Sequence, residues 1–406
     1  MKIKAVSWAI TLLLIAITPH SYSDTKASSG RVSGIPMEQL KAFAETYWQI
    51  KNSYVDQVDD KQLFEGAING MLKSLDPYSG YLNEEDLKDL QVSSDGVYDG
   101  LGVEVVAEDE QVRVVSIIED SPAARAGIKE NDRIVAVDAH SLVDVGAESL
   151  IDSMRGVAGE PVVLKILHPE SQLPVTYQLV RETLEVKSIR VAQMPQDIWH
   201  VTIKMFQRDT GYELEQLIRR ATANKRVAGV IVDLRNNPGG VLTAAVDVAD
   251  LMIASGIIVS TEGRTVDSYQ KFFANPGDIL EATPIVVLIN GQSASASEIV
   301  AGALQDHKRG LIVGQQSYGK GVVQSIVPLK QNTAIKLTTS RYLTPTGRSI
   351  HGKGIAPDVE LKQDATANNA LPSLADKELQ QAYDLLLNQV ASGKVETKAQ
   401  LTSTVK

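Results

Sequence analysis

The chain has 406 residues, about two or three times the usual size of one domain, so several domains and a sizeable core are expected. Apolar residues make up 43% and charged residues 22%, as in soluble globular proteins, which excludes a largely disordered or fibrous chain. The net charge of −10 argues against nucleic acid as a partner. Cysteine is absent, which excludes disulfides, thiolate metal sites and a cysteine nucleophile.

The first 23 residues are typical of an export signal. Lys2 and Lys4 precede an apolar stretch over residues 5–17, and small residues follow at Ser21 and Ser23. This stretch is shorter than the about 20 residues of a membrane-spanning helix, although an uncleaved anchor stays an alternative. We therefore expect a periplasmic or otherwise exported protein, which could associate with the inner membrane. Loss of the signal's two lysines would change the net charge from −10 to about −12.

A polar linker over residues 24–35 leads to a region in which two amphipathic helices are predicted, at residues 37–54 and 60–75. The run Asp76-Pro77-Tyr78-Ser79-Gly80 contains residues that favour turns and a proline that cannot continue a helix, so it ends the second one. The helical region as a whole is expected to extend over residues 36–96.

Residues 97–184 change to short strands with two short helices. Gly100-Leu101-Gly102 precedes an apolar strand. In the run over residues 121–127 a proline opens a short helix and a glycine closes it. This pattern, with the strand that begins at Asp132-Arg133-Ile134, resembles a PDZ domain.

Beyond residue 184 the pattern alternates between strands and helices. Strands are predicted at residues 200–206, 230–234, 284–289 and 311–314, and helices at residues 210–223, 242–254 and 298–305. Such alternation implies parallel strands joined by crossover helices, and hence an α/β core over residues 185–361. The polar tail over residues 362–406 contains one predicted helix at residues 377–387. The fold class is therefore α/β, within a multidomain α+β chain.

The first candidate for chemistry is Ser295, in a segment that follows a buried strand and opens a helix. A nucleophile there sits beside unpaired backbone N–H groups and the positive end of the helix dipole, which favours a developing oxyanion. The run Ser295-Ala296-Ser297-Glu298 also fits a capping box, in which Ser295 would only cap the helix. The spacing alone leaves both interpretations open.

The second unusual turn ends in Gly239-Gly240 and also leads from a strand into a helix. Paired glycines allow a substrate carbonyl to approach the backbone, so an N–H group of Gly239 or Gly240 could hold an oxyanion together with that of Ala296. A plain turn without function is the alternative.

A serine nucleophile needs a base, and histidine is poorly placed. His307 lies about 18 Å along a regular helix from Ser295, beyond hydrogen-bond reach, while His200 and His351 stay open on spacing. Lys320 lies in a segment without other charges, which would help to lower its pKa from about 10.4 to nearer 7–8. In an extended segment Gln324 would share its face and hold the amine, although an exposed loop lysine is the alternative.

Several linked runs resemble the family of C-terminal processing peptidases, or tail-specific proteases, of the serine/lysine type with a PDZ domain. The resemblance covers about residues 37–361 and is carried by residues 233–240, 293–299, 314–324, 342–348 and 352–358. It implies a crotonase-like α/β protease core, with the PDZ domain inserted after the N-terminal helices.

The resemblance also implies roles for individual residues. Ser295 would be the nucleophile, Lys320 the base and Gln324 the residue that orients the lysine. The PDZ domain would bind a substrate's C-terminal tail at Gly100, Leu101 and Gly102 and gate the active site. Arg155 resembles the arginine through which such domains contact the protease body. No metal or other cofactor is implied.

The sequence therefore predicts an exported serine endopeptidase that acts by acyl transfer on protein or peptide substrates with a free C-terminus. An adaptor protein and a homo-oligomer formed through the terminal helices are compatible with this interpretation. The alternatives are an inactive PDZ scaffold and a crotonase-like acyl-CoA enzyme.

Overall fold

The computed structural model describes residues 34, 36–108, 111–223, 227–281, 283–330, 332–361 and 376–392. The expected export signal, most of the linker and much of the C-terminal tail lie outside these residues. The chain divides into two compact units between Ala67 and Ile68. Within the described ranges, no helix is both long enough and apolar enough to cross a membrane.

The first unit contains the two predicted N-terminal helices as far as residue 67. They are α1 (Met37–Ser53) and α2 (Asp60–Lys73), which continues into the second unit. Tyr47 joins the helices, because its ring centroid lies 5.3 Å from that of Phe64 and its hydroxyl donates to Asp60 over 2.8 Å. No residue of α1 is buried, so this helix exposes its apolar side chains.

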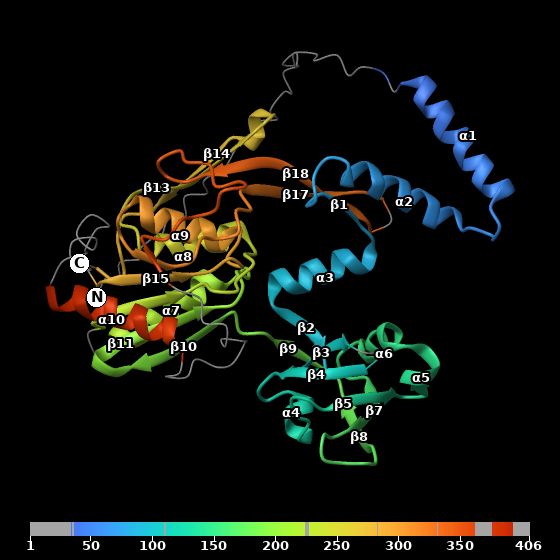
Figure 1. Ribbon diagram of the computed structural model, residues 1–406, viewed down its shortest axis with the longest axis horizontal. Coiled ribbons are helices and arrows are strands. Elements are labelled where there is room, and N and C mark those ends of the chain that lie inside the picture. Colours follow the sequence, from blue (N-terminus) through green and yellow to red (C-terminus); the bar gives the residue numbers. More distant parts are fainter. Residues whose placement is uncertain are drawn as a thin grey trace, which may run out of the picture. The chain divides into compact units, whose positions relative to one another are not determined.

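The PDZ-like region is an antiparallel sheet covered by short helices (Figure 1). Its strands are, in sheet order, β3 (Val103–Glu108), β4 (Gln111–Ile117), β5 (Arg133–Val137), β7 (Pro161–Leu167) and β8 (Val175–Val180), with β6 (His140–Ser141) beside β5. Its helices are α4 (Pro122–Ala126), α5 (Leu142–Val145) and α6 (Ala147–Met154). The pair β2 (Val97–Gly100) and β9 (Glu182–Glu185) leads into and out of the region. The strands and two helices agree with the prediction, and α5 is additional.

The α/β core contains the expected parallel sheet. Its order is β10 (Ile189–Met194), β11 (Ile198–Ile203), β12 (Gly229–Asp233), β15 (Ile285–Ile289), β16 (Leu311–Gly314) and β19 (Val359–Glu360). All neighbouring pairs are parallel except β10 with β11, which follow one another through the short helix η1 (Pro195–Asp197). The strand predicted at residues 200–206 corresponds to β11, which ends three residues earlier, at Ile203.

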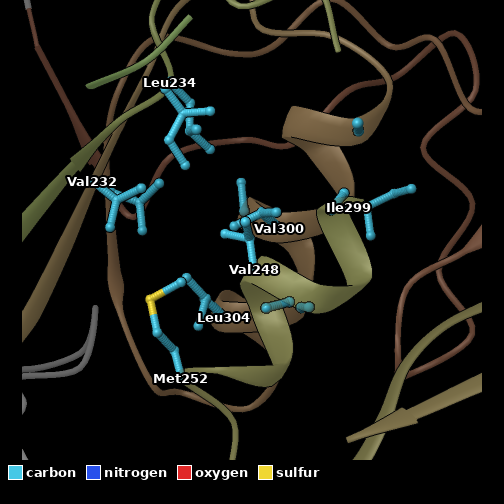
Figure 2. Packing of buried hydrophobic residues seen from close by; sticks show 14 of the residues in the cluster. Val232, Leu234, Val248, Met252, Ile299, Val300 and Leu304 are labelled. Atoms are coloured by element: carbon cyan, nitrogen blue, oxygen red, sulfur yellow. The ribbon is translucent and has the colours of Figure 1, made fainter. Parts of the chain in front are cut away.

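Helices cover both faces of this sheet, which explains why its strands are continuous apolar runs. On one face lie α7 (Thr210–Thr222), α8 (Leu242–Asp250) and α9 (Ala296–Asp306), and on the other lies α10 (Lys377–Ser392). Figure 2 shows Val232 and Leu234 facing Val248 of α8, Met252 just after this helix, and Val300 of α9.

A second sheet and one helix were not predicted. The sheet contains β1 (Gly80–Leu82), β13 (Gly256–Gly263), β14 (Gln270–Ala274), β17 (Val322–Pro328) and β18 (Ala334–Leu343), with η2 (Val266–Ser268) between β13 and β14. The helix is α3 (Glu84–Asp95), which begins with a capping box formed by Asn83 and Asp86. Residues 76–79 form the expected turn, which leads into β1.

Candidate active site

Ser295 lies at the turn where the buried strand β15 gives way to α9. Its backbone has φ 56° and ψ −114°, a conformation that costs energy for a residue with a side chain. The N–H group of the next residue, Ala296, has no hydrogen-bond acceptor among the described residues. The strained turn therefore presents the serine hydroxyl beside a free donor at the helix N-terminus.

The other two serines of this run are bound to the backbone. The Ser293 hydroxyl donates to the Leu234 carbonyl over 2.8 Å, and the Ser297 hydroxyl donates to the Asn237 carbonyl over 3.0 Å. Both serines are fully buried, whereas Ser295 is half-buried. These bonds attach the Ser295 turn to the turn after β12, so Ser293 and Ser297 have a structural part.

The glycine turn after β12 lies directly against Ser295. A Cβ atom on Gly239 would come within 2.7 Å of the Ser295 Cβ, and the φ of Gly239 is 109°, so a glycine is required there. The Gly239 N–H group donates to Asn237 Oδ1 over 2.8 Å. The Gly240 N–H group has no acceptor among the described residues. Of the two expected glycine donors, Gly239 must therefore lose a hydrogen bond before it can hold an oxyanion.

Glu298 connects the turn that carries Ser295 to the loop that carries Lys320. This fully buried carboxylate accepts from the N–H groups of Ser295 at 2.8 Å, Gly319 at 2.7 Å and Lys320 at 2.9 Å, and from the Ser317 hydroxyl at 2.5 Å. Burial raises the pKa of Glu298 above its ordinary value, although the four donors lower it. The bond to Ser295 is the one that a capping box predicts. The other three bonds join Glu298 to the segment that carries Ser317, Gly319 and Lys320.

Lys320 is half-buried, and its surroundings favour the neutral amine. Burial, followed by the nearby charge of Lys336, lowers the pKa of Lys320 below its ordinary value. Its Nζ atom lies 5.1 Å from the centre of the Tyr78 ring. Among the described residues no hydrogen bond joins Nζ to Ser295 or to Gln324.

The expected contact between Lys320 and Gln324 is absent for a structural reason. The extended segment begins only at Val322, so Lys320 lies in the preceding loop and does not share a strand face with Gln324. Gln324 Nε2 instead donates to Thr338 Oγ1 over 3.4 Å, across the β17–β18 pair. The structure thus brings the backbones of Ser295 and Lys320 together, but it does not join the side chains of Ser295, Lys320 and Gln324 by hydrogen bonds.

The histidines left open by spacing differ in their surroundings. His200 Nε2 lies 3.0 Å from Asp233 Oδ2 in a buried pair, and His307 Nε2 lies 2.7 Å from the Ile257 carbonyl. His351 Nδ1 is buried without a hydrogen-bond partner among the residues that the structure describes, and its ring centroid lies 6.4 Å from that of Tyr78. None of these three forms a hydrogen bond with Ser295 within the described chain.

The predicted tail-binding loop is a buried segment of the PDZ-like region. A Cβ atom on Gly102 would come within 2.1 Å of the Ser121 Cβ, and Gly102 has φ 82°, so the loop packs tightly around a glycine. The N–H groups of Leu101 and Gly102 have no acceptor in the described part of the chain. Neighbouring free N–H groups of this kind can bind a carboxylate.

Arg155 contacts a different element from the one expected. Its guanidinium lies 2.7 Å from Asp89 and 3.9 Å from Glu85, both on α3, and the Asp89 hydrogen bond raises the Arg155 pKa. Among the described residues it makes no ion pair with the α/β core. Arg155 thus binds α3 in this structure, and its expected contact with the protease body stays a prediction.

Arg235, in the glycine turn, connects this turn to the C-terminal helix. Its guanidinium lies 2.7 Å from Asp233 and from Asp376, and 3.0 Å from Glu378. Burial raises the pKa of Asp233, but hydrogen bonds from His200 and Arg235 lower it more, to about 2. The start of α10 is thus attached to the segment that carries Gly239.

Comparisons with known proteins agree with this architecture. Residues 197–361 match peptidase family S41, residues 100–179 match a PDZ domain, and residues 13–86 match the N-terminal domain of the activating protease CtpB. The carboxy-terminal-processing protease of Bartonella bacilliformis is 43% identical over 329 residues, 80% of this chain and 76% of the relative. The chain belongs to the carboxy-terminal-processing proteases. It is therefore a serine-type peptidase and not an acyl-CoA enzyme.

Other members of this protease family extend the similarity. The carboxy-terminal processing protease CtpB of Bacillus subtilis is 32% identical over 79% of this chain and 67% of its own length. A crystal structure of an S41 protease from Bacteroides fragilis has a TM-score of 0.52 and 16% identity, covering 84% of this chain and 91% of that chain. The latter likeness concerns the fold alone.

The sequence analysis missed two residues of this protease's candidate site. The Tyr342 hydroxyl donates to the Lys320 carbonyl, and burial raises the Tyr342 pKa well above its ordinary value, although a hydrogen bond from Ser295 lowers it. Tyr78 lies beneath the Lys320 amine. Tyr342 belongs to a run that resembles the family, and this resemblance could have drawn attention to it. The sequence around Tyr78 indicates only a turn.

Proposed function

We propose that this carboxy-terminal-processing protease is an exported endopeptidase that uses Ser295 as nucleophile, Lys320 as base and Gln324 to orient the lysine. The observation that supports this assignment most directly is the shared carboxylate of Glu298. It binds the backbone N–H groups of both Ser295 and Lys320, so the two segments keep a fixed spacing.

The proposed reaction is acyl transfer. Neutral Lys320 accepts the Ser295 proton while the serine oxygen attacks the substrate carbonyl carbon, and the lysine then returns the proton to the leaving amine. The N–H groups of Ala296 and of the Gly239–Gly240 turn hold the oxyanion. Water then hydrolyses the acyl-enzyme. The lowered pKa of Lys320 supports its use as a base near neutral pH.

We further propose that the PDZ domain binds the substrate's free C-terminus and controls catalysis. The free N–H groups of Leu101 and Gly102 support carboxylate binding, with Gly100 before them in the loop. Helix α3 offers a physical connection, since its Asp89 binds Arg155 of the PDZ domain and its Ser94 carbonyl accepts from the Arg208 N–H group of the core over 2.9 Å.

The proposed setting is the periplasm or another exported location, as the sequence of the first 23 residues suggests. Helix α1 supports a homo-oligomer, because several of its large apolar side chains are exposed, among them Leu40, Phe43 and Trp48. An adaptor protein that binds the same helix is an alternative occupant.

The catalytic assignment is tested by substitution of Ser295 and Lys320. Ser295→Ala should abolish both proteolysis and labelling by a fluorophosphonate, while Ser297→Ala, which loses only a bond to a backbone carbonyl, should keep part of both. Lys320→Arg should be as inactive as Lys320→Ala, because a guanidinium does not deprotonate near neutral pH. Proteolysis by purified Ser295→Ala, or by Lys320→Arg, would refute the respective role.

Control by the PDZ domain is tested with paired protein substrates that differ only in a free or amidated C-terminus. Amidation removes the charge that the Leu101–Gly102 loop would bind, so KM should rise, kcat should fall, or both. Equal values of kcat/KM for the two tails would exclude gating by the tail.

A further inference from the structure

The turn after α2 places an aromatic ring against the proposed catalytic base. Lys320 Nζ lies 5.1 Å from the Tyr78 ring centre, within the about 6 Å over which an ammonium is attracted to an aromatic face. Both residues are half-buried, so water screens this attraction only in part. The turn therefore contributes an attractive contact between the Tyr78 ring and the Lys320 ammonium.

The backbone of the turn that carries Tyr78 is held by hydrogen bonds within the turn and to β18. Asp76 accepts from the N–H groups of Tyr78 at 2.8 Å and Ser79 at 2.7 Å. The buried Ser79 hydroxyl donates to Asp76 and accepts from the Thr338 N–H group over 3.1 Å. Thr338 also accepts the hydrogen bond from Gln324. One residue of β18 thus holds both the Tyr78 turn and the glutamine assigned to the lysine.

Other groups near Lys320 do not offer the ammonium a competing partner. The titratable residues that face it or its loop are Lys336, Glu298, Tyr318, Tyr342 and His351. Lys336 repels the ammonium, and the Glu298 oxygens are occupied by backbone and hydroxyl donors. Within the described residues no carboxylate lies at ion-pair distance from Nζ.

We propose that Tyr78 is a positioning residue whose ring holds the protonated Lys320 side chain away from Ser295 in the substrate-free enzyme. This inference rests on the proposed role of Lys320 as base. The ring attracts only the charged amine, whereas catalysis needs the neutral amine near Ser295. Tyr78 therefore opposes deprotonation in the free enzyme, and productive substrate binding must release the side chain from the ring.

The pH dependence of catalysis distinguishes this role from a structural one. The fall of kcat/KM at acid pH reports the pKa of the base in the free enzyme. The fall of kcat at acid pH reports the pKa of the base in the substrate complex. Tyr78→Leu keeps an apolar side chain but removes the ring. We expect the acid limb of its kcat/KM profile to move to lower pH by about 0.4 to 1.5 pH units. At pH values below this limb, kcat/KM should therefore rise roughly 2.5- to 30-fold. The kcat limb and the high-pH plateau should stay unchanged.

Two further variants serve as controls that do not depend on Tyr78→Leu being well folded. Tyr78→Phe keeps the ring face and should keep the wild-type limb, and Tyr78→Trp has the stronger face and should move the limb to higher pH. Thermal unfolding of each variant reports any loss of fold. The inference would be overturned if the acid limbs of kcat/KM coincide for Tyr78→Leu, Tyr78→Phe and the wild type. It would also be overturned if Tyr78→Leu lowers activity by the same factor at every pH.

The same assay separates this inference from the assignment of the base. Activity in Lys320→Ala would refute Lys320 as base, and the role of Tyr78 with it. An inactive Lys320→Ala enzyme together with unshifted limbs in the Tyr78→Leu and Tyr78→Trp variants would refute the role of Tyr78 alone.

Discussion

Glu298→Gln tests whether one buried carboxylate fixes the spacing of the Ser295 and Lys320 segments. One Glu298 oxygen accepts from Ser317 and Gly319, and the other accepts from Ser295 and Lys320. Glutamine keeps a single acceptor oxygen and places an NH₂ group against the other pair of donors. Either the Gly319 N–H group or the N–H groups of Ser295 and Lys320 must then lose their partner.

The size of the effect follows from these contacts. A buried donor without a partner costs about 1–3 kcal/mol, and the remaining bonds also lose the strength that the carboxylate charge gives them. Removing the charge recovers part of the cost of burial, which is what raises the pKa of Glu298. We expect the free energy of unfolding to fall by about 2–4 kcal/mol and fluorophosphonate labelling of Ser295 to slow by about tenfold or more.

Denaturant unfolding and labelling rates should be measured together, with Asp306→Asn as the matched control. Asp306 is a carboxylate of the same helix that accepts from Thr346 and pairs with Arg348, without a contact to Ser295 or Lys320 among the described residues. This control should lose stability while keeping its labelling rate. Unchanged stability and labelling in Glu298→Gln, or equal slowing in Asp306→Asn, would refute the reasoning.

Two further outcomes follow from the glycine turn. Gly239→Ala places a methyl group 2.7 Å from the Ser295 Cβ, so kcat/KM should fall at least about tenfold. Gly70→Ala, in helix α2 with open space around it, should keep its activity. Because the pKa of Asp233 is about 2 against an ordinary 3.8, its charged form stabilises the fold above pH 4 by about 2 kcal/mol, and this is lost as the pH falls through 2. Urea unfolding at pH 5 and pH 2 should show a smaller loss in Asp233→Asn; an equal loss would contradict the assigned pKa.

Local patterns predicted the buried elements of this protease better than the half-exposed ones. Strands such as β12 and β15 are covered by helices on both faces, so their sequences are continuous apolar runs. In contrast, β18 mixes threonines, serine and charged residues because most of its side chains are only partly buried. Helix α3 has no buried residue and so shows little periodicity. Its acidic start and capping box were the available signals.

The candidate site was predictable where it depends on local turns. Ser295 and Gly239 each follow a parallel strand, and strands of one sheet bring their carboxyl ends together. The relation between Lys320 and Gln324 could not be predicted, because the loop before β17 is held by residues remote in sequence. Gly352 donates to the Gly319 carbonyl over 2.9 Å, and His351 packs against Gly321. Tyr78 reaches the lysine only through the pairing of β1 with β18.

The candidate site combines a fixed backbone with side chains that are not in the arrangement that the proposed mechanism needs. Glu298 holds the backbones of Ser295 and Lys320 together, so activation does not require refolding of either segment. In the proposed mechanism, Lys320 leaves Tyr78, Gln324 leaves Thr338, and Gly239 releases its N–H group from Asn237. Each of these three steps breaks one weak contact worth about 1 kcal/mol. The free energies of the observed and the productive arrangement should therefore differ by only a few kcal/mol. A substrate that binds the productive arrangement more tightly by that amount is sufficient to shift the equilibrium.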